Sequence, residues 1–532
     1  MERINIIGAG LAGLSAAITL ARAGKPCALI SSQVSERAQS VMAEGGINAA
    51  LDVMGEHDTT AEHFSDTMKG GVFLADPNAV AGLTEGAPGI VRWLHEIGVP
   101  FQLENGHIIQ RNFGGQKKKR TAYAKSSTGK AIMTALIDET RKYEVSGLIE
   151  RFSHHTAVDI SVCSAGCSGA VVRDVFTGKT ELFPGKVILA NGGLNGFFPG
   201  QTTGTTQNTG GLAAALFACG MEFADLEFIQ YHPTTVQIHG KRMLISEAAR
   251  GEGGRLFTER SGKRWYFMEE LYPELGNLMP RDVVSREMFK VMHEPECGGQ
   301  VYLDVTGLPQ RTWKHKLSDL RTEIIDYLGV DPAEEPVAVS PGIHFFMGGI
   351  YVNEKHETSI PGVYAAGECA CQYHGANRLG GNSMLGALYG GMTAAQSALT
   401  APELSGTAER IQWDCVDEEE RPSAAYELCD ILLSGLGIIR SEEKIAAAIA
   451  ELEKALAFPI PKPEHDRMLL GKAMLMSALE RRESRGAHTR SDFQQRDDEK
   501  FQRTTVACLK NGDISIEMRS IPKRRAENEV HA

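Results

Sequence analysis

A glycine-rich turn near the N-terminus separates two apolar segments. Ile4–Ile7 and Cys27–Ile30 have the length and composition of buried strands, and an alanine- and leucine-rich segment between them predicts a helix. Together with the turn Gly-Ala-Gly-Leu-Ala-Gly, these segments form a strand–turn–helix–strand unit within about thirty residues, the βαβ unit that binds dinucleotides. The pyrophosphate of such a ligand lies at the helix N-terminus. We therefore expect an α/β fold in which Gly8, Gly10 and Gly13 contact a dinucleotide cofactor.

The second predicted strand leads into Ser31 and Ser32. Many dinucleotide-binding units have an acidic residue here, which accepts hydrogen bonds from ribose hydroxyls. A serine hydroxyl can bond the same groups. We expect both serines to lie beside the cofactor ribose.

Two segments far along the chain are expected to join the same sheet. Residues 187–193 (Val-Ile-Leu-Ala-Asn-Gly-Gly) form an apolar strand that ends in a glycine turn, and residues 362–368 (Gly-Val-Tyr-Ala-Ala-Gly-Glu) form another that ends in an acid. An N-terminal βαβ unit combined with a late Gly-x-Tyr-Ala-x-Gly-Glu strand is the layout of flavoproteins that bind FAD. Gly192 and Glu368 are accordingly predicted to contact the cofactor.

A chain of 532 residues is too long for one hydrophobic core, so we expect more than one domain. The prediction is a Rossmann-like FAD-binding domain at 1–232 and 344–402, an inserted α+β capping domain at 233–343, and a C-terminal helical domain and tail at 403–532. Helical patterns in the last part cover residues 424–436, 441–456 and 466–481. The acidic run Asp417–Glu420 is interpreted as the exposed start of a helix.

Charge and cysteine content argue against several classes of protein. The net charge of −12 is unfavourable for a nucleic-acid binder. The ten cysteines are scattered and match no metal or haem spacing, so we expect no metal and a reducing, cytoplasmic compartment. Met1 leads directly into the first strand and no apolar run is long enough to cross a bilayer, so neither a signal peptide nor direct membrane insertion is expected.

The segment His374–Ser383 places one arginine among small residues, in the order His-Gly-Ala-Asn-Arg-Leu-Gly-Gly-Asn-Ser. Arg378 stays charged at any working pH and can bind a carboxylate with two hydrogen bonds. The glycines let the backbone approach a flat ligand, and Asn377 and Asn382 supply neutral hydrogen bonds. Alone, the segment is equally compatible with a glycine-rich loop that holds a structural arginine.

Further motifs, in order along the chain, give a family resemblance. They are Ala43–Ile47, Phe113–Gly115, Arg120–Thr121, Thr128–Gly129, Gln230–Thr234, Glu247–Gly253, Pro280–Asp282, His344 with Met347–Gly349, and Glu483–His488. With the glycine turn and the Arg378 segment, they make the chain similar, nearly end to end, to the flavoprotein subunits of succinate dehydrogenase and fumarate reductase. L-Aspartate oxidase is a close relative of that family. The resemblance implies an FAD enzyme that interconverts fumarate and succinate.

The resemblance also implies how a dicarboxylate is bound. His232, His344 and Arg378 are expected to bind its carboxylates, and Ser246 and Glu247 to be partners of the second carboxylate. Many relatives have threonine at the position of Ser246. A short dianion in a dry site needs several cationic or donor groups, which these residue types supply.

Proton transfer is expected to depend on Arg281, which the resemblance identifies as the proton donor. The same comparison implies that Glu247 and Arg250 return the proton to it, while hydride passes between flavin N5 and the alkene. Glu247 and Arg250 are three residues apart, which places them on one face of a helix. Arginine is a weak acid, so this role requires a nearby path for proton exchange.

Gln39 is the first departure from the family pattern. Members that belong to membrane complexes attach FAD covalently to a histidine just before the Ala-x-Gly-Gly turn, where this chain has Gln39. An amide is not a nucleophile, so we expect noncovalent FAD. The missing link favours fumarate reduction, or aspartate oxidation, over succinate oxidation. The other expected cofactor contacts are Ser40, Gly45, Gly46, Ser383 and Leu385.

Phe113 is the second departure, and it separates fumarate reductase from aspartate oxidase. Aspartate oxidases have a glutamate at this position to receive the substrate ammonium, and a phenyl ring cannot pair with a buried ammonium. We expect Phe113 to line the substrate site. The length of the chain is more typical of aspartate oxidase, which therefore stays as an alternative.

Our first hypothesis is that the protein is a fumarate reductase flavoprotein, or that of a succinate dehydrogenase, without metal centres of its own. It would exchange electrons with a separate iron–sulfur subunit or a soluble reductant, and any link to a membrane would be through that partner. L-Aspartate oxidase is the first alternative. A noncatalytic FAD-carrying electron-transfer component is a remote one.

Overall fold

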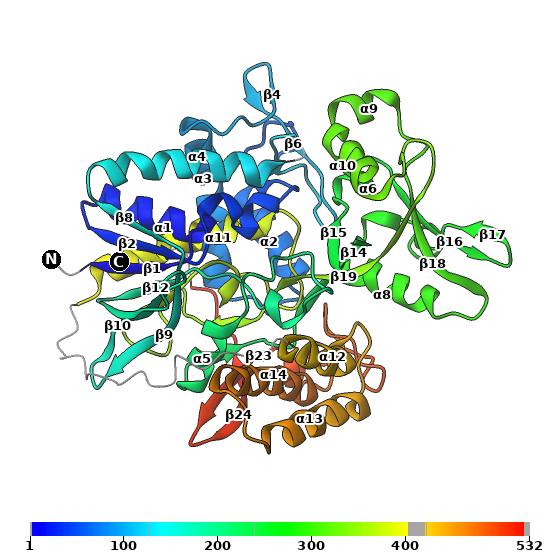
Figure 1. Ribbon diagram of the computed structural model, residues 1–532. Helices are drawn as coiled ribbons and strands as arrows, with labels where there is room; N and C mark the ends of the chain where they lie inside the picture. The colour runs from blue at the N-terminus through cyan, green and yellow to red at the C-terminus, as the bar shows by residue number, and fades with distance from the viewer. Residues whose placement is uncertain (1–2, 126, 239, 403–420, 422, 526–532) are drawn as a thin grey trace.

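A computed structural model describes residues 3–525 apart from positions 126, 239, 403–420 and 422. Its centre is a parallel sheet of five strands in the order β21-β12-β1-β2-β8 (Figure 1). The strands are β1 (Ile4–Ile7), β2 (Cys27–Ser31), β8 (Ile149–Ser153), β12 (Val187–Leu189) and β21 (Val363–Ala365). The sequence prediction that distant segments join the N-terminal unit is confirmed, because β12 pairs with both β1 and β21.

The two faces of this sheet pack against different layers, as the period of two along a strand requires. Ile6 and Leu29 belong to the core shared with a helical layer, whereas Ile7 and Ile30 belong to the core on the opposite face. The helical layer contains α1 (Leu11–Arg22), α3 (Pro77–Glu96), α4 (Thr128–Val145) and α11 (Asn382–Thr400). The opposite face carries a sheet of β9 (His155–Cys163), β10 (Gly166–Asp174) and β11 (Thr180–Pro184).

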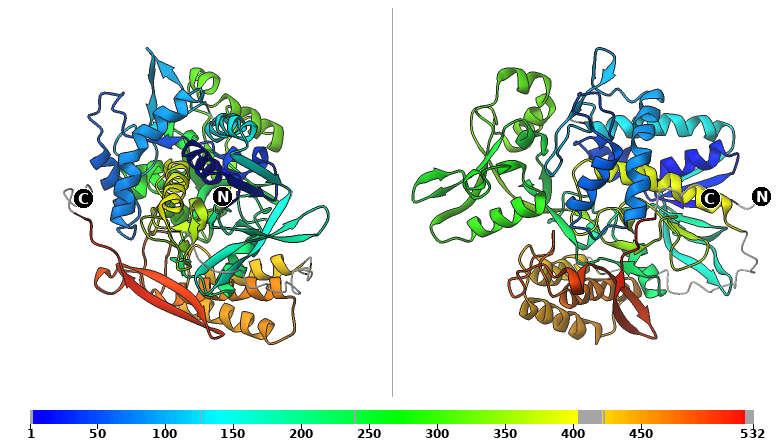
Figure 2. Two further views of the ribbon diagram at one scale, coloured as in Figure 1. Left: turned by 90° about the vertical axis from the view of Figure 1, so that its left-hand side faces the viewer. Right: turned by 180° about the vertical axis from the view of Figure 1, so that it is seen from behind.

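A second, antiparallel sheet forms the inserted part of the chain. Its strand order is β15-β14-β19-β18-β16-β17. The bounds are β14 (Ile229–Ile238), β15 (Lys241–Leu244), β16 (Arg255–Arg260), β17 (Lys263–Trp265), β18 (Cys297–Asp304) and β19 (Val337–Phe346). Helices α8 (Arg281–Met292), α9 (Gln310–His315) and α10 (Ser318–Leu328) accompany it. This antiparallel module, the chain from β14 to β19, projects to one side of the molecule in Figure 1 and in the right view of Figure 2, and it agrees with the α+β insertion of the predicted fold class.

The C-terminal part contains α12 (Ala424–Leu436), α13 (Glu442–Leu456) and α14 (Lys462–Glu480), as the sequence predicted. Helix α14 begins earlier than expected because Pro461 is its N-cap residue and Pro463 lies in its first turn, positions that tolerate proline. The acidic run Asp417–Glu420 lies outside the described residues. After α14 the chain forms an unpredicted hairpin, β23 (Arg503–Lys510) and β24 (Asp513–Ser520), which extends the sheet of β13 (Phe223–Ala224), β20 (Gly349–Tyr351) and β22 (Ala370–Cys371).

Shorter elements connect these layers. They are β3 (Ile47–Asn48), β4 (Leu103–Glu104), β5 (His107–Ile108), β6 (Gln110–Arg111), β7 (Thr121–Ala122), α2 (Thr60–Gly70), α5 (Gly211–Ala218), α6 (Ala248–Gly251), α7 (Phe267–Leu271) and α15 (Asp498–Phe501). Among the described helices, none is both long enough and apolar enough to span a bilayer.

A buried arginine ties the C-terminal hairpin to the residues that precede β14. Arg481 is fully buried, and its Nε donates to Glu227 Oε1 over 2.6 Å. Its other nitrogens donate to Glu483 Oε1, to the Arg503 carbonyl and to Thr505 Oγ1. The guanidinium thus balances two buried carboxylates, Glu227 and Glu483, that lie far apart in the sequence.

Arg481→Ala is expected to destabilise the protein by about 3–5 kcal/mol, because it leaves the buried Glu227 carboxylate without its ion-pair partner. Thermal unfolding followed by circular dichroism measures the effect. Arg482→Ala is the matched control, since Arg482 is exposed and its loss is expected to change stability by less than about 0.5 kcal/mol. Equal unfolding temperatures for the two variants would contradict this account of the network.

Candidate functional site

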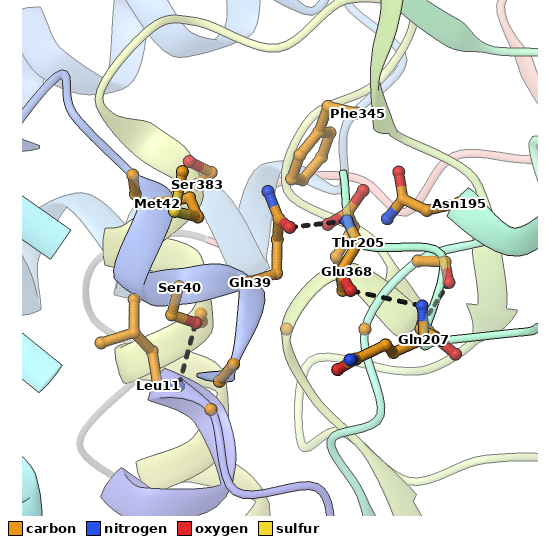
Figure 3. Close-up of a pocket in the computed structure, with 18 of the residues that line it drawn as sticks. Leu11, Gln39, Ser40, Met42, Asn195, Thr205, Gln207, Phe345, Glu368 and Ser383 are labelled. Atoms are coloured by element: carbon orange, nitrogen blue, oxygen red, sulfur yellow. Dashed lines mark hydrogen bonds between the residues drawn. The ribbon is translucent and has the colours of Figure 1, made fainter. Parts of the chain in front are cut away.

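A cavity of about 1070 Å³ lies where the parallel sheet meets the antiparallel module. It is lined at one end by the β1–α1 turn and the end of β2, and at the other by residues of β14, α8 and the Arg378 segment. Figure 3 shows part of its wall, with Gln39 and Ser40 on one side and Thr205 and Glu368 on the other. The cavity therefore joins the predicted cofactor residues to the predicted substrate residues.

Two positions of the β1–α1 turn, Gly8 and Gly13, leave no room for a side chain. Gly8 has φ +111°, and a Cβ added to it would lie 2.2 Å from the Ala190 carbonyl oxygen. A Cβ on Gly13 would lie 1.8 Å from the Gly8 carbonyl oxygen. Helix α1 begins after Gly10 without a side-chain cap, although Ser40 Oγ accepts a hydrogen bond from the Leu11 amide over 3.3 Å. The helix N-terminus thus faces the cavity with amide groups that suit an anionic pyrophosphate.

Most of the other predicted cofactor residues line the same cavity: Ser31, Ser32, Gln39, Ser40, Gly45, Gly46, Gly192, Glu368 and Ser383. Gly13 and Leu385 do not line it. Gly13 packs behind the turn, and the Leu385 side chain is buried in the core beneath α11.

Polar groups on the wall are available to a bound dinucleotide. Asn191 Oδ1 has no hydrogen-bond partner among the described residues, and Asn191 lines the cavity. Burial raises the pKa of Glu368 to about 7, and its Oε1 accepts a hydrogen bond from the Phe346 amide over 3.0 Å. Gln39 Oε1 accepts a hydrogen bond from the Thr205 amide over 2.7 Å, so this side chain is held by the opposite wall (Figure 3). These groups and the glycine turn fit FAD.

Two buried arginines meet at the substrate end of the cavity. Arg281 Nη1 and Arg378 Nη2 both donate to the side-chain oxygen of Gln230, over 3.2 and 3.0 Å. Gln230 in turn donates through Nε2 to Asn377 Oδ1 and to the Arg378 carbonyl. Arg378 also lies over the ring of Phe345, with its Cζ 4.3 Å from the ring centroid. Burial, with the charge of nearby Arg281, holds the pKa of Arg378 well below its usual range.

Glu247 lies between Arg281 and a third buried arginine, Arg250, the two residues with which the sequence analysis grouped it. Arg281 donates to Glu247 Oε2 through Nε (2.8 Å) and Nη2 (2.6 Å), and Arg250 Nη2 lies 3.5 Å from Glu247 Oε1. Burial by itself would raise the pKa of Glu247, but Arg281 and Arg250 lower it below its ordinary value. Glu247 is therefore an ionised carboxylate in a buried place. Arg250 does not line the cavity; it lies behind Glu247 and donates to the Asn277 carbonyl.

Two histidines face each other across the start of the antiparallel module. His232 on β14 and His344 on β19 have ring centroids 5.1 Å apart. Burial and the charge of Arg281 lower the pKa of both rings well below the ordinary value, so both are neutral. His232 Nδ1 accepts a hydrogen bond from the Thr234 amide over 3.3 Å, which places its hydrogen on Nε2, an atom that has no partner among the described residues. His344 Nδ1 lies 2.8 Å from Thr203 Oγ1.

Phe113 and Ser246 complete the predicted set, and both line the cavity. Beside them lies a residue that sequence reasoning did not assign, Glu44. Its carboxyl is buried, and burial together with the charge of Glu323 raises its pKa to about 8, against a hydrogen bond from Ser246. Gln230 was also not assigned a role, although it belongs to the Gln230–Thr234 motif. Neither residue type has a sequence signal that separates a site residue from an ordinary polar one.

Among the described residues, no group of three or more histidine, cysteine, aspartate or glutamate side chains could hold a metal ion.

Comparisons with known proteins agree with these features. Residues 4–384 match the family model described as FAD binding domain, and residues 464–530 match fumarate reductase flavoprotein C-term. The succinate dehydrogenase flavoprotein subunit of Bacillus subtilis is 34% identical, over 95% of this chain and 93% of that protein. The 8-methylmenaquinol:fumarate reductase flavoprotein subunit of Wolinella succinogenes is also 34% identical, over 96% and 89%.

A solved structure gives the same result. A quinol fumarate reductase from E. coli superposes with a TM-score of 0.85 at 28% identity, covering 98% of this chain and 96% of that one. The end-to-end similarity confirms both the predicted fold class and the resemblance drawn from the motifs. The chain belongs to the family of succinate dehydrogenase and fumarate reductase flavoprotein subunits, and it is an FAD-dependent oxidoreductase.

Proposed function

We propose that the protein is the flavoprotein of a fumarate reductase, with fumarate reduced to succinate at the Arg281–Arg378 end of the cavity. The observation that carries the proposal is the convergence of Arg281 and Arg378 on one neutral oxygen, Gln230 Oε1, beside the ionised Glu247. Arg378 gives Gln230 a single hydrogen bond through Nη2, and its Nε has no partner among the described residues, so this guanidinium keeps most of its donors and its charge for a ligand. A carboxylate of a small dicarboxylate matches it in charge and geometry.

The substrate carboxylates are bound by groups from both parts of the chain. Arg378 comes from the segment before α11, whereas His232, His344 and Ser246 come from the antiparallel module. Because both histidines are neutral, they act as hydrogen-bond donors and not as charges. The partnerless Nε2 of His232 is such a donor.

Proton delivery is assigned to Arg281. When bound and reduced by two electrons, FAD would supply a hydride to one carbon of the alkene and return to its oxidised form. Arg281 gives a proton to the neighbouring carbon, so that one hydride and one proton convert fumarate to succinate. The two short hydrogen bonds to Glu247, and the contact of Glu247 with Arg250, form the path that returns the proton to Arg281. The polarised carboxylates make the alkene more electrophilic, an effect of fixed charges in a site that excludes water.

The FAD is proposed to be bound noncovalently, because Gln39 stands where a histidine would form the covalent bond and its amide is not a nucleophile. Its side-chain oxygen is already engaged by the Thr205 amide. Acid denaturation of the purified protein is expected to release the flavin into the supernatant, where absorbance and chromatography identify it as FAD. Flavin that stays with the precipitated protein would contradict noncovalent binding.

Electrons must reach the FAD from another protein or from a soluble reductant, which we propose to be an iron–sulfur subunit or a reduced carrier. The described residues offer no cluster of metal ligands that could store electrons. Relatives in Bacillus subtilis and Wolinella succinogenes are named as flavoprotein subunits, which supports a partner protein.

L-Aspartate oxidation is the second candidate, and Glu44 is the observation that keeps it. Phe113 cannot pair with a substrate ammonium, but Glu44 is a carboxyl group in the same wall. Burial raises its pKa to about 8, so it is mainly protonated at neutral pH and is a poor counter-ion in the free enzyme. The noncatalytic alternative is disfavoured because Arg281, Glu247 and Arg378 are assembled around one cavity.

A three-way assay distinguishes these functions. The purified protein with FAD is expected to oxidise a reduced viologen dye when fumarate is added, and to produce little peroxide with L-aspartate. Peroxide from L-aspartate without fumarate reduction would establish the aspartate oxidase alternative. A flavin that is inert with both substrates would favour the noncatalytic component.

Arg281→Ala is expected to lower kcat for fumarate by about 10²–10⁴-fold, the usual contribution of a general acid. Bound FAD and the KM for fumarate are expected to change little, because the lost interaction acts in the transition state. Steady-state kinetics with the viologen dye measures both constants. A variant with the kcat of the wild type would refute proton delivery by Arg281.

Arg378→Ala is the contrasting variant, since the same truncation here removes the group that binds a carboxylate. The expected loss is in binding, about 3–5 kcal/mol if a buried carboxylate is left unpaired. It appears as a large rise in the KM for fumarate. An unchanged KM would refute the assignment of Arg378.

A further inference from the structure

The backbone that follows Arg378 passes directly against the proton-delivery residues. A Cβ added to Gly380 would lie 3.2 Å from Glu247 Oε2 and 3.4 Å from Arg281 Nη2. Gly381, with φ +85°, then ends the loop as the N-cap residue of α11. Gly381 and Ser383, in the first turn of α11, both line the cavity. A small shift of this backbone would move the carboxylate-binding arginine and the start of α11 together.

The buried side chain of Asn48 on β3 makes several hydrogen bonds to this backbone. Its Nδ2 donates to the Gly380 carbonyl and to Asn382 Oδ1, each over 2.8 Å. The backbone N–H of Asn48 donates to the Gly381 carbonyl over 3.2 Å. A Cβ on Gly381 would lie only 2.2 Å from Asn48 Oδ1. The left-handed turn at Gly381 is therefore fitted to the Asn48 carboxamide.

Neighbouring side chains fix the orientation of that carboxamide. Thr121 Oγ1 donates to Asn48 Oδ1 over 2.6 Å and Gln116 Nε2 donates to it over 3.1 Å. Gln116 Nε2 also donates to the Gly380 carbonyl over 2.8 Å. The oxygen of Asn48 thus faces donors and its nitrogen faces acceptors, so the two ends of the amide cannot be exchanged without loss.

The far side of the network reaches helix α2. Asn382 Oδ1, which accepts from Asn48, also lies 3.0 Å from His63 Nε2, and Asn382 Nδ2 donates to Thr67 Oγ1 over 3.0 Å. Burial lowers the pKa of His63 to about 3, so the ring is neutral and its Nε2 donates to Asn382. The start of α11 is therefore joined through side chains to β3 and α2, and no residue of these two elements lines the cavity.

We propose that Asn48 is a positioning residue that sets the place of Arg378 and of the α11 N-terminus at the same time. The proposal rests on the function proposed above. Helix α11 has no side-chain cap at its N-terminus, and Gly381, Ser383 and Met384 at that end line the cavity, so the positive end of the helix dipole faces whatever is bound there. Because a helix N-terminus stabilises negative charge, its displacement makes bound FAD harder to reduce. Loss of Asn48 thus affects both substrate affinity and flavin potential.

Asn48→Asp tests the proposal, because it keeps the shape and the acceptor but removes both donations from Nδ2. The expected results are a KM for fumarate at least tenfold above that of the wild type and a more negative flavin midpoint potential. The potential is measured by dye-coupled reduction without substrate. Asn48→Ser, which adds no buried charge, is expected to show the same two changes to a smaller degree and serves if the first variant does not fold.

Asn5→Asp is the matched control. Asn5 is also fully buried, and its Nδ2 donates to two carbonyls, of Phe183 and Pro184, but neither of these acceptors lies in the Arg378 segment or lines the cavity. This variant is expected to lower the unfolding temperature without changing the KM or the potential. The proposal is overturned if the folded Asn48 variants keep the KM and potential of the wild type, or if Asn5→Asp shifts both as much.

The two readouts separate this inference from the proposed function. A wild-type protein that does not reduce fumarate would refute the proposed function. The substrate-free potentials of the Asn48 and Asn5 variants would still decide whether Asn48 positions the α11 N-terminus at the FAD.

Discussion

The structure depends on how like charges are accommodated in one buried place. Arg250, Arg281 and Arg378 are all nearly inaccessible to water, and the one ionised carboxylate among them is Glu247. Burying charges without partners is costly, and burial accordingly lowers the pKa of Arg250 and Arg378. Three guanidinium groups against one carboxylate leave two positive charges in excess. The dicarboxylate proposed as substrate would supply the two negative charges that this arrangement lacks.

This charge arrangement forms where the chain passes between the parallel-sheet part and the antiparallel module, because each part contributes some of the residues. Strands β14 and β19 leave the parallel-sheet part side by side, with His232 paired to Gly342 and Tyr231 to Ile343. Those pairings bring His232 and His344 together, while α8 presents Arg281 toward the segment that holds Arg378. Gln230 stands at the start of this crossing and accepts hydrogen bonds from both arginines. The residues at this end of the cavity therefore come from both parts of the chain, and neither part alone contains all of them.

Sequence reasoning succeeded where a residue has a local reason to be what it is. The glycines of the first turn are needed because Gly8 and Gly13 leave no room for a Cβ, and that requirement is visible as a motif. Asn48 could not be found this way. It acts on the Gly380 carbonyl, 332 residues away, and a buried asparagine looks like any other polar residue in the sequence. The hairpin β23–β24 was missed because β23 pairs with the distant strand β13 and β24 then pairs with β23, and sequence periodicity does not reveal such long-range pairing.

The same charge excess bears on the choice between fumarate and L-aspartate. An amino group that is protonated would bring a positive charge into a wall that already has two in excess. Phe113 offers that charge no partner. Burial raises the pKa of Glu44 to about 8, so in the free enzyme its carboxyl group is mainly neutral at neutral pH. Ionising Glu44 to receive an ammonium would cost part of the binding energy. An unsubstituted dicarboxylate avoids that cost, so the electrostatics of the site favour fumarate over aspartate.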